Sequence, residues 1–99
     1  MSSWKPGYTT SFRHDYEKLK KINPQIKDRA KNGMTMILES QNPGRLGEHK
    51  INNIECIYGY EIGLKYRILY EVFDEKREVI FYRIGLHDIY KQNLQRLKP

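Results

Sequence analysis

The sequence predicts one small α+β domain. Apolar residues recur at helical spacing up to about Ser40, and from about Ile54 they alternate with polar residues at the period of a strand. A chain of 99 residues is long enough for one hydrophobic core but not for two. Helices followed by a run of strands are typical of the α+β class.

The first half of the sequence predicts a helical hairpin preceded by a short strand. Residues 1–7 are interpreted as a lead-in, and residues 8–11 as a short strand followed by a helix cap. Phe12, Tyr16 and Leu19 then fall at the i, i+4 and i+7 positions of one helical face. This spacing predicts the first helix.

The second helix is expected to begin directly after the first. Asn23 is a good helix cap and Pro24 suits the first helical turn, so one helix ends and the next begins there. Gly33 lies inside this second helix and weakens it by about 1 kcal/mol relative to alanine. The apolar face of the helix, which extends to about Ser40, comprises Ile26, Ala30, Met34, Ile37 and Leu38. So short a break predicts an antiparallel hairpin.

The second half of the sequence predicts a loop and then three strands. Residues 41–53 contain two Gly, one Pro and three Asn, which marks a loop. The segments of period two that follow predict strands near residues 54–62, 65–73 and 78–85. Residues 74–77, DEKR, are typical of a tight hairpin turn between the last two strands.

The chain is strongly basic. Its 18 Lys and Arg residues against 12 Asp and Glu residues give a formal net charge of +6 and a pI of about 9.5. Such a charge favours binding of nucleic acid or of an acidic protein, and makes that binding depend on salt.

Several classes of function are excluded by motifs that the sequence lacks. Cys56 is the single cysteine, so no internal disulfide is expected, and the absence of a signal-like or membrane-length apolar run predicts a cytosolic protein. The three histidines are too scattered for a structural zinc site, and no phosphate-loop, dinucleotide-binding or serine-hydrolase motif occurs. We therefore expect no metal and no cofactor, and any catalysis must use side chains alone.

The hairpin turn is expected to bring two candidate catalytic residues together. If Phe73 lies opposite Glu78, then Arg67 lies opposite Ile84, close to the segment GLHDIY that follows. At about 3.3 Å per residue, His87 then lies within about 10 Å of Arg67. A fixed cation and a titratable imidazole therefore meet at the open end of the hairpin.

The chemistry of these residues suits a phosphodiester. An arginine in a strand otherwise apt for burial needs a partner, and Arg67 either pairs with Glu61 or Glu71 or holds phosphate oxygens with its planar fork. His87, whose unperturbed pKa is about 6.5, suits proton transfer beside a group that stabilises developing negative charge. Tyr90 either stacks on an unpaired base or packs against a helix.

Basic residues are expected to form a rim around the same end of the hairpin. Each is individually typical of solvated surface, but together they predict a groove for an RNA strand. The members of this predicted rim are Arg45, His49, Lys50, Lys65 and Arg83.

The segments that carry these residues resemble the RelE/ParE superfamily of bacterial and archaeal toxins. The similarity runs from Tyr8 to about Leu94, through YTTSFRHDYEKLKKINPQI, NPGRLGEHKI, YEIGLKYRILYEV and VIFYRIGLHDIY. Its most specific part is YRILYEV followed by an acidic turn and a strand that ends in glycine. The resemblance implies one domain over residues 1–99, with two N-terminal helices on a twisted antiparallel sheet and a short C-terminal helix.

The resemblance also implies an activity. RelE-type members cleave mRNA in the ribosomal A site without a metal, by attack of the ribose 2′-hydroxyl on the adjacent phosphate. By this resemblance Arg67 stabilises the phosphate, His87 is similar to the catalytic histidine of the YafQ-like branch, and Tyr90 matches the terminal aromatic residue. His49 falls in the loop where some members carry another catalytic histidine. Glu61 stands near the position of the RelE lysines, which favours a histidine-based mechanism.

Two other functions stay open beside this ribonuclease. The ParE branch has the same fold, poisons gyrase and generally lacks the Arg67 and His87 pair, so this pair favours cleavage of RNA. A non-catalytic member that only binds an antitoxin or RNA is the third interpretation, because the segment from Gly85 to Tyr90 is one residue shorter than in the family. The expected partners are a RelB-like antitoxin, mRNA in the ribosomal A site and ribosomal RNA.

Overall fold

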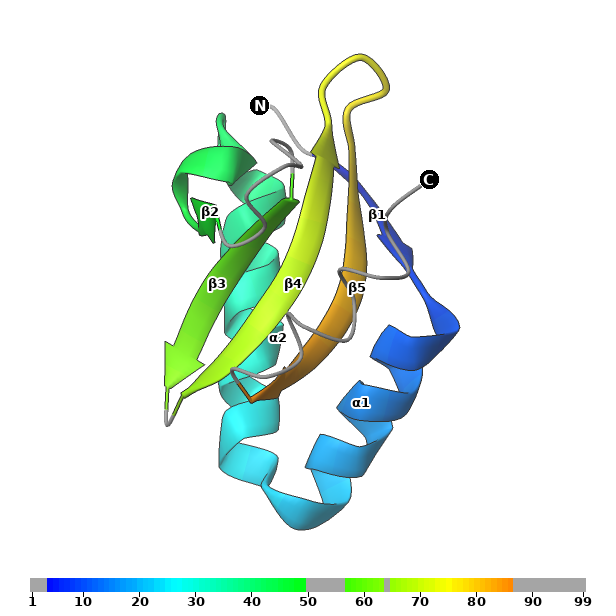
Figure 1. The fold of residues 1–99 in the computed structure, drawn as a ribbon, viewed down its shortest axis with the longest axis vertical. Coiled ribbons are helices and arrows are strands. Elements are labelled where there is room, and N and C mark those ends of the chain that lie inside the picture. Colours follow the sequence, from blue (N-terminus) through cyan, green and yellow to red (C-terminus); the bar gives the residue numbers. More distant parts are fainter. Residues whose placement is uncertain (1–3, 50–56, 64, 87–99) are drawn as a thin grey trace.

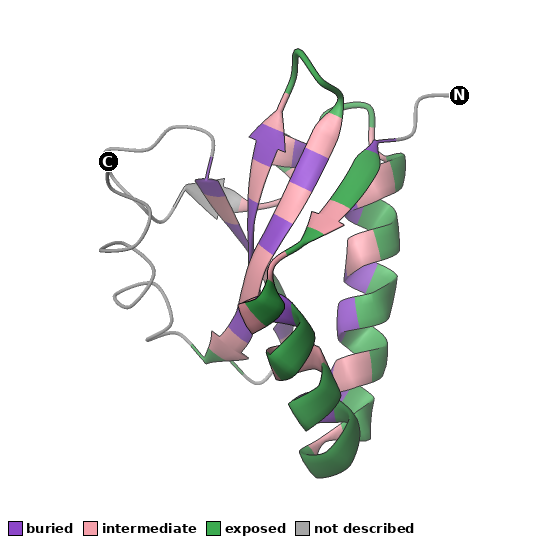
Figure 2. Cartoon of the chain, turned by 90° about the vertical axis from the view of Figure 1, so that its right-hand side faces the viewer, coloured by how far each residue is buried: buried purple, intermediate pink, exposed green. Residues whose placement is uncertain are grey.

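The computed structural model describes residues 4–49, 57–63 and 65–86, in which two helices lie on one face of a five-stranded sheet (Figure 1, Figure 2). The helices are α1 (Thr10–Ile22) and α2 (Pro24–Glu39), and a short 3-10 helix, η1 (Pro43–Arg45), follows them. The strands are β1 (Lys5–Tyr8), β2 (Glu48–His49), β3 (Ile57–Gly63), β4 (Tyr66–Phe73) and β5 (Glu78–Leu86). Their order is β1-β5-β4-β3-β2, and the predicted α+β class is confirmed.

The interpretation of residues 1–7 as a lead-in is wrong for Lys5 to Gly7, which belong to β1. This strand pairs in parallel with the first half of β5. The sheet is therefore mixed, whereas a purely antiparallel sheet was expected. The indole of Trp4 is only 5% exposed and donates a hydrogen bond to the carbonyl of Ser40 at 2.9 Å. The start of β1 is thereby fixed against the end of α2. The expected C-terminal helix falls outside the described residues.

Thr9 joins β1, β5 and α1. Its side chain caps α1 by accepting a hydrogen bond from the amide of Phe12, as Thr does at many helix starts. Its hydroxyl also donates to the carbonyl of Tyr82 at 2.8 Å, and its amide donates to that of Phe81 at 3.1 Å. The first turn of α1 is therefore held against β5.

Asn23 separates the two helices, as predicted. Its amide donates to the carbonyl of Leu19 at the end of α1, and its side chain accepts from the amide of Ile26 at the start of α2. From this joint the helices run in opposite directions and splay apart (Figure 1). Both turn their apolar stripes toward the sheet, where Phe12 and Ile37 are among the buried residues.

The β4–β5 hairpin has the predicted pairing register at its turn but not at its open end. Phe73 lies opposite Glu78 as expected, but a bulge beside Leu69 takes up one extra residue of β5. Arg67 therefore lies opposite Gly85 and not opposite Ile84. The correction moves Arg67 one residue nearer to the end of β5.

Strand alternation sorts the side chains of β4 onto two faces. Ile68, Tyr70 and Val72 belong to the core under the helices. Because successive side chains of a strand point to opposite faces, Arg67 and Glu71 lie on the face away from the helices. The candidate site therefore occupies the face opposite the main core.

Candidate functional site

Arg67 occupies the start of β4 between two neighbouring strands. It lies opposite Glu61 of β3 and Gly85 of β5. Its Nε atom is buried and makes no hydrogen bond within the part of the chain that the structure describes. A buried donor without a partner costs about 1–3 kcal/mol. Such a donor in a native fold requires an explanation, and an anionic ligand on the guanidinium is one.

Neither carboxylate considered from the sequence pairs with Arg67 in the described structure. Glu61 is exposed, and no ion pair joins it to its cross-strand neighbour. Glu71 accepts a short hydrogen bond from the hydroxyl of Tyr82 instead, on the same face of the sheet. The purely structural interpretation of Arg67 therefore lacks its expected partner among the described residues.

Arg83 has a well-defined protein partner. Its Nε and Nη2 atoms donate to the two carboxylate oxygens of Asp15 at 2.7 and 3.1 Å, and the amide of Ile84 donates to the same carboxylate at 3.0 Å. The hydrogen bond to Asp15 raises the pKa of Arg83. β1 pairs with β5 only as far as Phe81, so Asp15 closes part of the strand edge beyond it. These contacts favour a structural contribution from Arg83.

The other described members of the predicted rim are divided between two regions. Lys65 is exposed in a left-handed conformation, with φ 66°, directly before β4 and two residues before Arg67. His49 pairs along the backbone with Tyr58, which in turn lies opposite Tyr70. Tyr70 is three residues, or roughly 10 Å, along β4 from Arg67. The backbone of His49 is thus level with a position of β4 that is three residues from Arg67, and its place in the RNA-binding rim stays a prediction.

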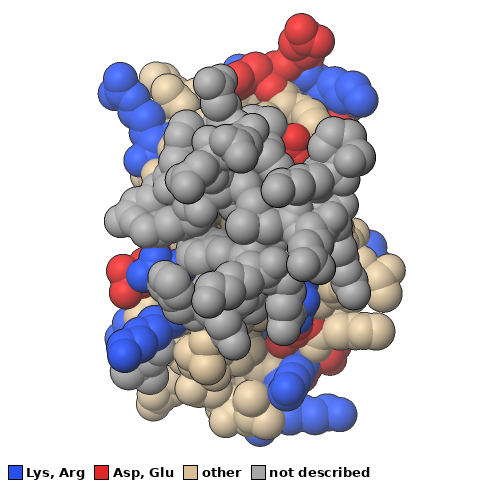
Figure 3. All heavy atoms as spheres, in the orientation of Figure 1, with Lys and Arg blue, Asp and Glu red and all other residues tan. Residues whose placement is uncertain are grey.

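Arg45 lies in the same part of the molecule as His49, near Tyr70. It is exposed at the end of η1, whose residue Pro43 accepts a hydrogen bond from the buried hydroxyl of Tyr70 at 2.7 Å. Burial raises the pKa of Tyr70 above its usual range. Around the margin of the face opposite the helices, Lys and Arg side chains are visible at both ends, and acidic side chains are most evident at the hairpin turn (Figure 3).

Three of the predicted residues fall outside the described structure: Lys50, His87 and Tyr90. Gly85 and Leu86, which lead to His87, are described, and Arg67 lies opposite the first of them. The approach of the segment GLHDIY to Arg67 is thus confirmed up to Leu86. The roles of all eight candidate residues remain predictions.

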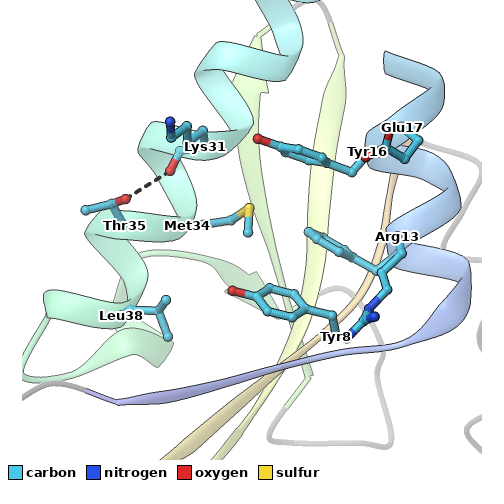
Figure 4. A pocket seen from close by; sticks show the side chains of 9 residues that line it. Tyr8, Arg13, Tyr16, Glu17, Lys31, Met34, Thr35 and Leu38 are labelled. Atoms are coloured by element: carbon cyan, nitrogen blue, oxygen red, sulfur yellow. Dashed lines mark hydrogen bonds between the residues drawn. The ribbon is translucent and has the colours of Figure 1, made fainter. Parts of the chain in front are cut away.

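Two features of the described structure were not anticipated from the sequence. One is the carboxylate of Asp15, whose partners lie 68 and 69 residues away along the chain. The other is a cavity of about 600 Å³ between α1 and α2, lined in part by Tyr16 and Met34 (Figure 4). Tyr16 and Met34 belong to the predicted apolar stripes of the two helices, and in the structure both are only half-buried.

No cluster of potential metal ligands occurs among the residues that the structure describes. In the same residues, no helix has the length and apolar character needed to cross a membrane.

The fold of this chain is similar to that of several solved toxin structures. A YoeB dimer from Staphylococcus aureus matches with a TM-score of 0.71 and 16% identity, covering 86% of this chain and 98% of that one. The toxin–antitoxin complex RelBE2 from Mycobacterium tuberculosis matches with a TM-score of 0.64 and 22% identity, covering 88% and 94%. The DinJ–YafQ complex from E. coli matches with a TM-score of 0.69 and 15% identity, covering 87% and 96%. At these identities the likeness establishes the fold alone.

The sequence itself identifies the family. The model of the ParE toxin of type II toxin–antitoxin systems, parDE, matches residues 7–89, which is most of the chain. The protein therefore belongs to the ParE toxin family, within the RelE/ParE superfamily, and is a toxin of a type II toxin–antitoxin system. A comparison with curated proteins found no match.

Proposed function

We propose that this toxin is a ribosome-dependent mRNA endoribonuclease that works without a metal. The observation that carries the proposal is the buried Nε of Arg67, which has no hydrogen-bond partner among the described residues. A guanidinium held at the end of two strands with an unused donor suits the oxygens of a phosphodiester. By its resemblance to RelE-type ribonucleases, the chain is likewise expected to use Arg67 to stabilise the phosphate.

The proposed reaction is a transesterification within the RNA strand. The ribose 2′-oxygen loses its proton and attacks the adjacent phosphorus, and the bond from phosphorus to the 5′-oxygen breaks. The products are a cyclic phosphate and a 5′-hydroxyl, which gains a proton. Arg67 stabilises the negative charge of the pentavalent transition state, and His87 transfers one of the two protons. Tyr90 stacks on a base next to the scissile bond.

The remaining predicted residues bind the backbone of the RNA. Lys65 lies closest in sequence to Arg67, and its exposed position before β4 supports a contact with a neighbouring phosphate. In this proposal the basic surface, with its net charge of +6, binds mRNA and ribosomal RNA in the cytoplasm. The contributing side chains are Arg45, His49, Lys50 and Lys65, whereas Arg83, the fifth residue of the predicted rim, is held by Asp15 and is assigned a structural contribution.

The same proposal includes a cognate antitoxin. The similar toxins of M. tuberculosis and E. coli were crystallised in toxin–antitoxin complexes. An antitoxin of RelB type would bind this chain and neutralise it. The positive charge of the toxin suits a partner that carries acidic side chains.

Inhibition of gyrase is the second candidate function, and the family match favours it. The matching family is described as the ParE toxin of parDE systems, although this chain carries the Arg67 and His87 pair that ParE members generally lack. The two functions have different products. An RNA cleavage product and a gyrase-dependent DNA break are measured separately in the same cells.

The test compares the two products after induction of the toxin in bacteria. We expect cleavage of translated mRNA within the coding region, no increase in gyrase-dependent DNA breaks, and growth arrest. Arg67→Ala and His87→Ala should each relieve the arrest and slow cleavage by about 10²–10³-fold, the usual cost of losing one such stabilising or proton-transferring group. Lys76→Ala, which removes an exposed charge from the hairpin turn, is the control and should remain toxic.

Three results would contradict the proposal. DNA breaks with intact mRNA would assign the chain to gyrase inhibition. Growth without arrest, from a protein that is folded and present, would favour a non-catalytic member. A toxic Arg67→Ala, His87→Ala double variant would remove these two residues from the mechanism.

A further inference from the structure

The segment between α2 and β2 is held at both of its ends. At its start, the indole of Trp4 donates to the carbonyl of Ser40 at 2.9 Å. At its end, the two residues of β2 pair with β3. We call residues 41–47 the η1 loop, and Figure 1 shows it beyond the end of α2, beside the start of β3. The loop carries Arg45, which is exposed.

A third contact holds the middle of the η1 loop and comes from β4. The hydroxyl of Tyr70 donates a hydrogen bond to the carbonyl of Pro43 at 2.7 Å, and both residues are less than 2% exposed. Burial raises the pKa of Tyr70, so the phenol keeps the proton that it donates. Arg45 follows Pro43 by two residues and belongs to the same turn of η1. The contact from β4 is therefore close to the arginine in the chain.

The backbone of the η1 loop also packs directly on the same tyrosine. A Cβ atom added at Gly47 would lie 2.7 Å from the Tyr70 hydroxyl and 3.0 Å from the carbonyl oxygen of Gly59 in β3, which leaves no room for a side chain. The ring of Tyr58 lies beside that of Tyr70, with the ring centres 5.7 Å apart. The position of the loop backbone is thus set by the tyrosine on which it rests.

Strand β4 therefore determines the positions of two arginines that the proposed function assigns to RNA. Arg67 is part of the strand, three residues before Tyr70. Arg45 is attached to the strand through the hydrogen bond from Tyr70 to Pro43. A change at Tyr70 is expected to move the second arginine relative to the first.

We propose that Tyr70 is a positioning residue for RNA binding, whose hydroxyl holds the η1 loop so that Arg45 contacts a phosphate of the RNA strand bound at Arg67. Tyr70 does not touch the RNA and acts only through Arg45. A side chain on a backbone that is fixed in advance loses less conformational entropy on binding than one on a mobile backbone, and its contact is stronger for that reason. The inference rests on the proposed function, in which Arg45 binds the RNA backbone.

A purely structural contribution of Tyr70 predicts a different result. In that case, loss of the hydroxyl lowers the stability of the fold and leaves the RNA affinity of the folded chain unchanged. In the positioning case the RNA affinity falls, and it falls only when Arg45 is present. A double-mutant cycle separates the two contributions.

The experiment measures binding of a 2′-O-methyl oligonucleotide by fluorescence anisotropy. All chains carry His87→Ala, which is expected to relieve toxicity and leaves both arginines in place. Arg45→Ala should weaken binding about 5-fold, the effect of one phosphate contact with a single strand at about 0.1 M NaCl. Tyr70→Phe, which removes only the hydroxyl, should weaken binding by up to the same factor, about 2–5-fold. Added to Arg45→Ala, Tyr70→Phe should weaken binding no further.

Two further variants test the assignment. Gly47→Ala displaces the η1 loop without any change to Tyr70, and it should also weaken binding only when Arg45 is present. Thr9→Val is the matched control, because it removes a hydroxyl that donates to the carbonyl of Tyr82 and caps α1, away from the loop. It should leave the affinity unchanged. Urea unfolding of each variant ensures that affinities are compared between folded chains.

Hydrogen exchange reports on the η1 loop without RNA. The amides of Arg45 and Leu46 make hydrogen bonds within the loop, at 3.0 and 3.3 Å. Tyr70→Phe should speed their exchange by about 2–10-fold, the effect of one lost hydrogen bond on local opening. Thr9→Val should leave this exchange unchanged.

Failure of this inference and failure of the proposed function give different results. Affinity unaffected by Tyr70→Phe, or lowered equally with and without Arg45, would overturn the positioning contribution in a chain that still binds RNA. Unchanged exchange of the loop amides in Tyr70→Phe would do the same. Absence of RNA binding would refute the proposed function and the contact of Arg45 with it, and the exchange would still decide whether Tyr70 holds the loop. The expected cycle, from a natural chain that does not cleave mRNA, would support the inference and refute only the ribonuclease.

Discussion

Two arginines on adjacent strands have different surroundings. Arg83 is engaged by both carboxylate oxygens of Asp15, in a bidentate geometry that uses two of its donors. Arg67 has a buried Nε without a partner in the described structure. Each arginine stands between a tyrosine and an isoleucine in the sequence. The local sequence therefore does not distinguish an arginine that stabilises the fold from an arginine that is a candidate for binding a ligand. The contacts of the folded chain make the distinction.

Removal of the Asp15 carboxylate should destabilise the fold. Asp15→Ala removes the acceptor of the Ile84 amide and two hydrogen bonds of the Arg83 guanidinium, at a cost of about 1–3 kcal/mol in the free energy of unfolding. Urea unfolding followed by Trp4 fluorescence measures this change. Asp28→Ala, which removes an exposed ion pair with Lys27, is the matched control and should not move the midpoint. Equal midpoints for the two variants would show that Asp15 contributes nothing to stability.

At the scale of elements, α2 approaches β3 closely at a glycine. A Cβ atom added at Gly33 would lie 2.7 Å from a ring carbon of Tyr60, which is nearer than such atoms normally approach. The glycine therefore lets the helix and the strand pack, although it is the weakest helix former after proline. Its presence in the middle of α2 reflects a tertiary contact and not a break in the helix.

This explanation predicts that the effect of Gly33→Ala depends on Tyr60. In the Tyr60→Ala background, Gly33→Ala should stabilise the chain by about 1 kcal/mol, the gain in helix propensity. In the natural background the contact with the ring should cancel or reverse that gain. A double-mutant cycle measured by urea unfolding gives the coupling. Asn32→Ala, on the exposed side of α2, should change stability equally in both backgrounds, and a zero coupling for Gly33 would refute the explanation.

At the scale of the whole molecule, the candidate site and the cavity between α1 and α2 lie on opposite sides of the sheet. The cavity lies on the helical side, and Arg67 lies on the face away from the helices. The lining of the cavity is mostly apolar, whereas the proposed binding of RNA at Arg67 depends on charge. RNA binding is therefore expected to weaken as the salt concentration rises.

The salt dependence of RNA binding should show the contribution of Arg67. For single-stranded RNA, the logarithm of the association constant falls with the logarithm of salt concentration by about 0.7 for each phosphate neutralised. Arg67→Ala should therefore reduce the slope by about 0.7 for a 2′-O-methyl oligonucleotide, which is not cleavable. Fluorescence anisotropy in increasing NaCl measures the slopes. A slope unchanged by Arg67→Ala would mean that this arginine does not contact a phosphate, and Lys76→Ala serves as the comparison.

The sequence determined the features of the fold that depend on near neighbours. The joint at Asn23 and Pro24 is read from capping chemistry, and the turn that places Phe73 opposite Glu78 is read from spacing. The α+β class follows from the change of period between the two halves of the chain. Each of these features depends on side chains a few residues apart, and a local pattern is sufficient to specify it. The selection of Arg67 as a candidate also came from the sequence.

The tertiary structure decided the features that depend on distant parts of the chain. The parallel pairing of β1, the bulge that brings Arg67 opposite Gly85, and the contact of Asp15 with Arg83 join residues that no sequence period relates. The cavity between α1 and α2 likewise depends on the angle at which the two helices diverge. Whether an apolar or charged side chain is used inside the fold or left for a ligand depends on the packing around it, which is fixed only when distant segments meet.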